Sequence, residues 1–112
     1  MRVGFLRAFF ILVLVSMLLV TAWASLDRSV FQAFFELGRD PWGLATLADA
    51  YFGFLTFYLW VFYKEGTAPG RAFWLVFILA FGNIAMSIYV LAQLWRLPKE
   101  ATVEALLLRR QA

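Results

Sequence analysis

The sequence predicts an all-α integral membrane protein that forms a single membrane domain over residues 1–112. It is expected to have three transmembrane helices, a short interfacial helix between the first and second, and an amphipathic C-terminal tail. Three apolar stretches carry the prediction, residues 8–24, 43–63 and 72–95. A helix rises about 1.5 Å per residue and needs roughly 20 apolar residues to cross a bilayer core. The composition agrees, because 64% of the residues are hydrophobic, against roughly 45–50% in soluble domains.

The first apolar stretch ends in Ala22-Trp23-Ala24 and follows two arginines, so it imitates a secretory signal peptide with its cleavage site. Trp23, however, is a residue type that anchors helix ends at the membrane interface. We therefore expect an uncleaved first transmembrane helix.

Residues 29–37 predict a short helix that lies in the membrane plane. Ser29 suits the N-cap position and Gly38 suits a C-terminal stop. The segment is too short to span a bilayer and too short to be helical alone in water. Its apolar face, together with Trp42 just beyond it, is expected to contact lipid or a partner: Val30, Phe31, Phe34, Phe35.

The second span begins at Asp40-Pro41, where Asp caps the helix and Pro fits its first turn. Residues 66–71 form a turn so short that the second and third spans must be antiparallel neighbours. The third span is expected to end at Trp95-Arg96-Leu97-Pro98. The tail, residues 98–112, is expected to form a second surface helix or to dock on a partner.

Three spans would place the N-terminus and the turn after Lys64 on one side of the membrane, and residues 25–40 and the tail on the other. Both sides then carry basic residues, and the first helix favours a cytoplasmic N-terminus. The expected location is the inner (cytoplasmic) membrane of a bacterium.

Polar residues within the spans form a candidate site. Asp49 lies about two turns inside the second span, where an acidic side chain costs up to roughly 2.5–3.5 kcal/mol. A continuous third helix would bring polar residues to a similar depth, which gives a predicted intramembrane polar cluster: Asp49, Tyr51, Asn83, Ser87, Tyr89. Asp49 could fix helix register by hydrogen bonding, receive a proton, cation or polar ligand head, or extend to the interface.

Residue types exclude several kinds of chemistry. The chain has no cysteine and no histidine, which removes disulfides, thiolate ligands and the commonest ligand of haem and zinc. We expect no metal site and no cofactor of its own, although the aromatic content makes contact with lipid, quinone or carotenoid reasonable. Basic residues at the predicted helix ends suit lipid headgroups, so no nucleic-acid partner is expected.

Four short motifs occur in order along the chain: Asp40-Pro41-Trp42, Thr46-Leu47-Ala48-Asp49-Ala50-Tyr51, Trp60-Val61-Phe62-Tyr63-Lys64-Glu65, and Gly82-Asn83 followed by Tyr89-Val90-Leu91. Over residues 25–97 the chain resembles a domain-of-unknown-function family of small membrane proteins from bacteria and plants. The resemblance implies a three-helix membrane fold without an established activity. It draws attention to Asp49, Lys64, Glu65 and Asn83.

Two functions are compatible with these observations. The first is a non-catalytic accessory or structural subunit that packs among other transmembrane subunits and lipids in a respiratory or photosynthetic complex. The second is a small transporter or lipid-acting membrane enzyme that uses Asp49 with Asn83 and Tyr51.

Overall fold

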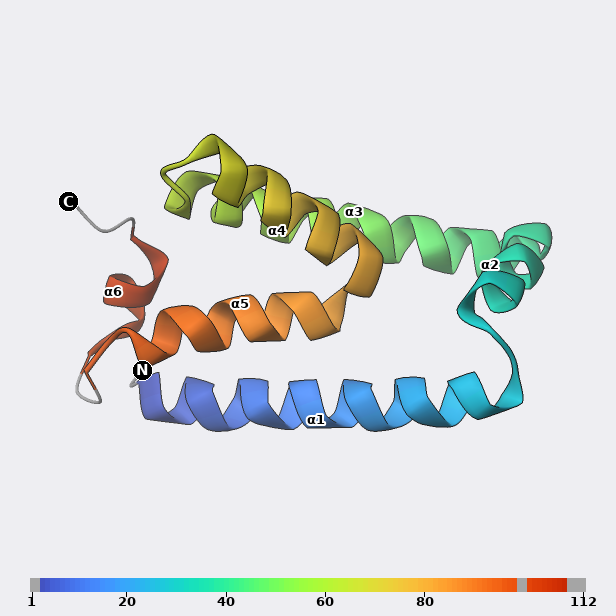
Figure 1. Ribbon diagram of the computed structural model, residues 1–112, viewed down its shortest axis with the longest axis horizontal. Helices are drawn as coiled ribbons and strands as arrows, with labels where there is room; N and C mark the ends of the chain where they lie inside the picture. The colour runs from blue at the N-terminus through green and yellow to red at the C-terminus, as the bar shows by residue number, and fades with distance from the viewer. Residues whose placement is uncertain (1–2, 99–100, 109–112) are drawn as a thin grey trace.

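The chain forms a slender bundle of helices in this computed structural model, which describes residues 3–98 and 101–108 (Figure 1). The all-α prediction is confirmed for this part of the chain. Its six helices are α1 (Val3–Asp27), α2 (Val30–Arg39), α3 (Pro41–Lys64), α4 (Ala68–Phe81), α5 (Asn83–Trp95) and α6 (Val103–Leu107). Of the predicted tail, residues 99–100 and 109–112 lie outside the described residues, as do residues 1–2 at the start.

Two helices of the described chain, α1 and α3, are long and apolar enough to cross a membrane. They run antiparallel along the long dimension of the molecule, which measures 46 Å (Figure 1). Both contain a predicted span and extend it at each end, from 8–24 to 3–27 and from 43–63 to 41–64. The first two predicted spans therefore correspond to single helices.

Helix α2 forms where the sequence predicts a short amphipathic helix. The Ser29 hydroxyl accepts a hydrogen bond from the Gln32 backbone N–H and caps the helix start. Gly38 does not end it, because the helix continues to Arg39 and stops at Asp40. The Asp40 carboxylate accepts from the Gly43 backbone N–H at 2.8 Å and so begins α3.

The turn from α2 to α3 depends on a glycine at the first turn of α3. A Cβ atom on Gly43 would lie only 2.4 Å from the carbonyl oxygen of Leu37. Any larger residue would push α2 away from α3, so the absence of a side chain lets α2 fold back along α3.

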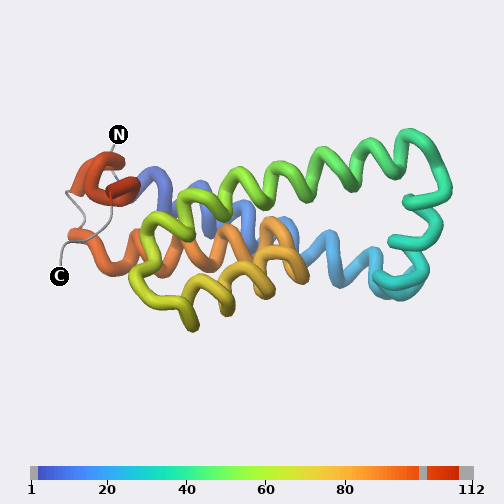
Figure 2. The backbone as a smooth tube through the Cα atoms, turned by 90° about the horizontal axis from the view of Figure 1, so that it is seen from above, coloured from blue at the N-terminus to red at the C-terminus, as the bar shows by residue number. Residues whose placement is uncertain are grey.

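The predicted third span is wrong as a continuous helix, because the chain reverses direction at Gly82. Helices α4 and α5 are antiparallel, and both lie in the half of the bundle nearest the N-terminus (Figures 1 and 2). The rings of Trp74 and Tyr89 lie 4.8 Å apart although they are separated by 15 positions, a distance that one straight helix would stretch to about 22 Å. The two helices thus form a hairpin with Gly82 at its tip.

The backbone at Gly82 explains the reversal. Its φ of +57° and ψ of −123° fall in a region that essentially only glycine adopts. The Phe54 ring also lies against it, and a Cβ atom on Gly82 would sit 2.6 Å from that ring. A single glycine in an apolar run does not predict such a break, because an isolated glycine is usually tolerated within a helix.

The buried core lies entirely toward the end of the bundle that holds the start of α1, the α3–α4 turn and α6, which we call the N-terminal end. Two groups of buried apolar residues fill it: Val3, Val90, Leu94 and Leu106 in one, and Val61, Ile78, Ala85 and Tyr89 in the other. The opposite end, which we call the α2 end, contains no comparable group among the described residues.

The described part of the tail lies at the opposite end of the bundle from the one predicted. Since α5 returns to the N-terminal end, α6 lies beside the start of α1 rather than at the α2 end (Figure 1). The Val3 backbone N–H donates to the Ala101 carbonyl, and Leu106 is buried against α1 and α5. The described part of the tail therefore docks on its own chain.

Replacing Gly82 by alanine is expected to lower the melting temperature of the purified chain in detergent. The strained backbone costs about 1–3 kcal/mol for a residue with a side chain, and the new methyl group would collide with Phe54. Gly53→Ala is the matched control, since nothing lies within 4 Å of its added Cβ and alanine favours helix. Equal melting temperatures for the two variants would contradict the reversal at Gly82.

Candidate functional site

The structure does not bring the predicted intramembrane cluster together. Asp49 is exposed on α3, and Asn83 is exposed at the tip of the hairpin. Ser87 and Tyr89 are buried in α5, nearer the N-terminal end. Within the described chain, Asp49, Tyr51, Asn83, Ser87 and Tyr89 make no hydrogen bond with one another, so each has a separate environment.

The reversal at Gly82 is the physical reason for this difference. A continuous third helix would carry Ser87 and Tyr89 past Asp49 toward the α2 end. The hairpin instead returns both residues toward the N-terminal end, while its tip lies against Phe54. Tyr51 then has a different role, because its hydroxyl donates to the Leu79 carbonyl at 3.2 Å. In an unbroken helix that carbonyl would accept the Asn83 backbone N–H.

The base of the hairpin is held by a buried tyrosine that the sequence did not link to its partner. Tyr89 is fully buried, and its hydroxyl donates to Glu65 Oε2 at 3.0 Å. Its ring contacts Trp60 and Trp74 edge to face, at 5.5 and 4.8 Å between centroids. Trp60 and Glu65 belong to one of the four sequence motifs and Tyr89 belongs to another. Membership in these motifs was the only sign in the sequence that the three residues matter, and it did not indicate that they are in contact.

Two arginine side chains cap the C-terminal ends of α3 and α5 at the N-terminal end of the bundle. Arg71 Nε donates to the carbonyls of Phe62 and Glu65, each at 3.0 Å, and its guanidinium lies 3.8 Å from the centroid of the Phe62 ring. Arg7 donates to the carbonyls of Leu94 and Leu97, at 2.9 and 2.8 Å. These carbonyls lie at or just beyond the C-terminal ends of α3 and α5, where positive charge is favourable.

The motif from Trp60 to Glu65, at the end of α3, also binds α6. Lys64 Nζ donates to the Leu106 carbonyl, and Trp60 Nε1 donates to the Leu107 carbonyl at 3.0 Å. The motif from Trp60 to Glu65 thus contacts both the hairpin and α6. Its described interactions are structural, and they account for Trp60, Lys64 and Glu65 without a ligand.

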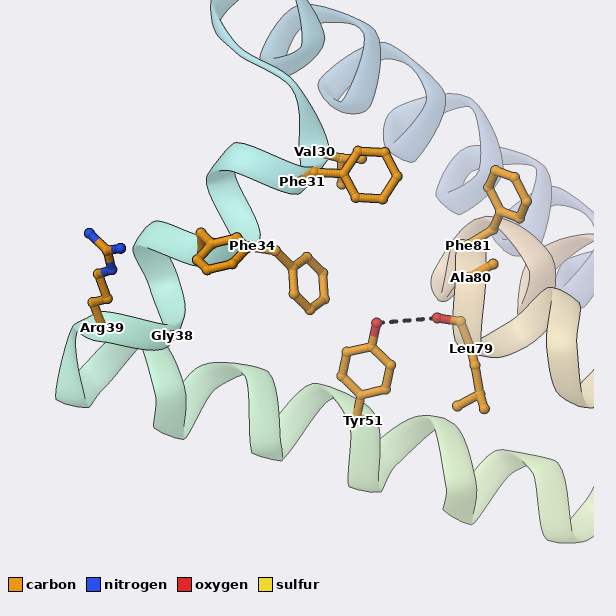
Figure 3. Close-up of a pocket in the computed structure, with 10 residues that line it drawn as sticks. Val30, Phe31, Phe34, Gly38, Arg39, Tyr51, Leu79, Ala80 and Phe81 are labelled. Atoms are coloured by element: carbon orange, nitrogen blue, oxygen red, sulfur yellow. Dashed lines mark hydrogen bonds between the residues drawn. The ribbon is translucent and has the colours of Figure 1, made fainter.

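An apolar groove of about 920 Å³ lies between α2, α3 and the tip of the hairpin (Figure 3). We call it the α2 groove. Predicted interfacial residues Phe31, Phe34 and Phe35 line it, whereas Trp42 is 83% exposed and lies outside it. The remaining lining comes from both ends of α2, from α3 and from the end of α4: Val30, Gly38, Arg39, Tyr51, Leu79, Ala80, Phe81.

The chemistry of this groove is that of an apolar binding surface. Phe34 and Tyr51 meet edge to face at 6.0 Å, and the Tyr51 hydroxyl already donates to Leu79 (Figure 3). Arg39 lies at the rim and points away from the other lining residues (Figure 3). Among the described residues, no group of three or more carboxylates is placed to hold a metal ion.

Comparison with known proteins identifies a family without an assigned function. The family described as "Protein of unknown function (DUF1475)" matches residues 1–111. No curated protein and no solved structure matches the chain.

The Glu65–Tyr89 pair provides a test of the hairpin base. Glu65→Ala and Tyr89→Phe are each expected to lower stability by about 1 kcal/mol, because the first leaves the buried Tyr89 hydroxyl, and the second the half-buried Glu65 carboxylate, without this hydrogen bond. Combining them should cost less than the sum of the single changes, since the same bond is lost in all three variants. Melting of the purified variants in detergent measures the coupling, and strictly additive effects would contradict a direct bond.

Proposed function

We propose, for a chain that belongs to the DUF1475 family of unknown function, that it is an integral membrane protein and a non-catalytic accessory subunit of a larger membrane complex. The observation that carries the proposal is the exposure of its apolar surface. In the most apolar part of each of the helices α1 and α3, only 6% of the residues are buried within the described chain.

Exposure on this scale distinguishes the two long helices from the core helices of a soluble protein. Leu12, Leu19 and Phe52, for example, are between 64% and 69% exposed. In water such continuous apolar surface would drive aggregation. Within a bilayer the same side chains contact lipid tails or other transmembrane helices at no such cost.

The distribution of charge supports one orientation. Arg7, Arg71 and Arg96 belong to the N-terminal end, together with Lys64. Among the described residues, the α2 end carries two basic residues, Arg28 and Arg39. By the positive-inside rule the N-terminal end faces the cytoplasm. The α4–α5 hairpin then enters from the cytoplasmic side and returns to it.

A lateral partner explains the polar stripe on α3. Thr46, Asp49, Gly53 and Thr56 recur at helical spacing, and all four are exposed. Asp49 forms no hydrogen bond or ion pair with the described residues, although it lies about 12 Å along the helix from Pro41. An unpaired carboxylate at that depth is costly in lipid. Small and polar residues are also those that mediate contact between membrane helices.

The same arrangement gives less support to a transporter or a lipid-acting enzyme. Such a function needs Asp49, Asn83 and Tyr51 to line one polar cavity. Tyr51 instead donates to the hairpin backbone, and Asp49 and Asn83 are exposed separately. We therefore favour the accessory subunit, within a respiratory or photosynthetic assembly.

The proposed topology can be tested with single cysteines, because the chain has none of its own. Ala68→Cys and Thr102→Cys, both at exposed positions, should react with an impermeant maleimide from the cytoplasmic side of sealed vesicles. Leu26→Cys, at a position that is 87% exposed, should react only from the opposite side. A continuous third span would place positions 68 and 102 on opposite sides, so labelling of Thr102→Cys together with Leu26→Cys would contradict the hairpin.

The partner surface predicts different effects for two changes at Asp49. Asp49→Asn keeps a hydrogen-bonding group and should leave the native complex nearly intact. Asp49→Leu should weaken association about 5- to 30-fold, the effect expected when a hydrogen bond between two transmembrane helices is lost. Ala48→Leu, exposed but outside the stripe, is the control.

Blue-native electrophoresis of mildly solubilised membranes, followed by mass spectrometry, measures the association and identifies the larger subunits. Migration of the wild-type chain only as a free monomer would contradict the accessory role. Loss of function in Asp49→Asn with an intact complex would instead support proton or cation handling.

A further inference from the structure

The α2 groove exists because the hairpin fills only part of the bundle. Helices α4 and α5 have 14 and 13 residues, and are therefore about 20 Å long, whereas α1 and α3 continue to the α2 end. The tip at Gly82 stops beside Phe54. Beyond it, α2 packs on α3, and the groove lies between the tip, α2 and α3 (Figure 3).

The lining of the groove suits a hydrocarbon chain. It is formed largely by Phe31, Phe34, Phe81 and aliphatic neighbours. The Tyr51 hydroxyl donates to the Leu79 carbonyl, so it does not offer a free donor to a polar ligand. The volume of about 920 Å³ lies within the usual range for small-molecule sites, about 300–1,000 Å³.

The rim of the groove suits an anionic headgroup. Arg39 contacts the Phe35 ring at 6.0 Å, and it forms no ion pair with any carboxylate in the described ranges. Arg28, the other arginine at this end, is instead paired with Glu36 and Asp27. Arg39 directly precedes Asp40, the residue that caps the start of α3, and this start is at headgroup level if α3 spans the membrane.

We propose that the α2 groove binds one anionic phospholipid, with an acyl chain against Phe31, Phe34 and Phe81 and the phosphate on the Arg39 guanidinium. The inference rests on the proposed membrane location. A guanidinium binds phosphate oxygens in a bidentate manner, and the apolar lining replaces the contacts that the chain would make with other lipid tails. The bound lipid occupies the space that the short hairpin leaves open.

Two substitutions separate the two halves of this site. Arg39→Gln removes the charge at the rim, and Arg96→Gln makes the same change at the opposite end of the bundle as a control. Ala80→Trp places a large side chain in the groove at an exposed position, so it should not disturb the core. Ala48→Trp is its control, because Ala48 is exposed on α3 and does not line the groove.

The test uses the full chain in nanodiscs that contain equal amounts of phosphatidylglycerol and phosphatidylcholine. Native mass spectrometry should detect one retained phosphatidylglycerol on the wild-type protein. Arg39→Gln should lower the preference for phosphatidylglycerol about fivefold, the effect of one basic residue at an anionic surface, and Ala80→Trp should abolish retention. Both controls should behave like the wild type.

Photolabelling with a phosphatidylglycerol that carries a diazirine on its acyl chain locates the lipid. Labels should concentrate on α2 and on residues 79–81. Labels spread evenly over the exposed faces of α1 and α3 would overturn the proposal, because the lipid would then be ordinary surrounding lipid. A dimer with crosslinks between the α2 grooves of two copies would also overturn it.

Carbonate extraction distinguishes failure of this proposal from failure of the membrane assignment. A chain that stays in the membrane pellet but retains no phosphatidylglycerol contradicts the lipid site alone. A chain released into the supernatant contradicts both.

Discussion

The reversal of the chain at Gly82 is the constraint on which the rest of the structure depends. It converts an apolar run long enough for a span into two short helices, α4 and α5. The buried core forms where α5 packs against α1 and where α4 and α5 pack against each other and against α3. The same reversal returns α6 to the N-terminal end and leaves the α2 groove open at the other end.

A broken helix in an apolar environment leaves backbone groups without partners, and side chains of this protein satisfy several of them. Tyr51 donates to the Leu79 carbonyl beside the break. Arg71 donates to carbonyls at the end of α3, and Arg7 to those at the end of α5. Such bonds matter most where water is absent, because an unsatisfied carbonyl then costs several kcal/mol. The polar residues around the hairpin are thereby explained as supports of the backbone.

The residues and surfaces that do not support the backbone are the ones relevant to function. Asp49 and Asn83 are exposed motif residues whose side chains form no hydrogen bond or ion pair with the described residues, and the large apolar faces of α1 and α3 are uncovered by the described chain. A surface of this kind is suited to lateral association more than to chemistry. The α2 groove adds a second surface of different character, with an apolar lining and an arginine at its rim, and these two features are the basis of the proposed lipid site.

The sequence alone determined the helical class, the two long helices and α2, because each follows from local signals. Ser29 and Asp40 cap helices as predicted, and the apolar face with Phe31 and Phe34 is the face that lines the groove. Only the tertiary structure decided the reversal at Gly82, since the packing of Phe54 against Gly82 and the pairing of Tyr89 with Glu65 join residues far apart in the chain. The prediction of a polar cluster around Asp49 assumed a continuous third helix. The backbone torsion at Gly82, which the residue order does not reveal, reverses the chain and places these polar residues apart.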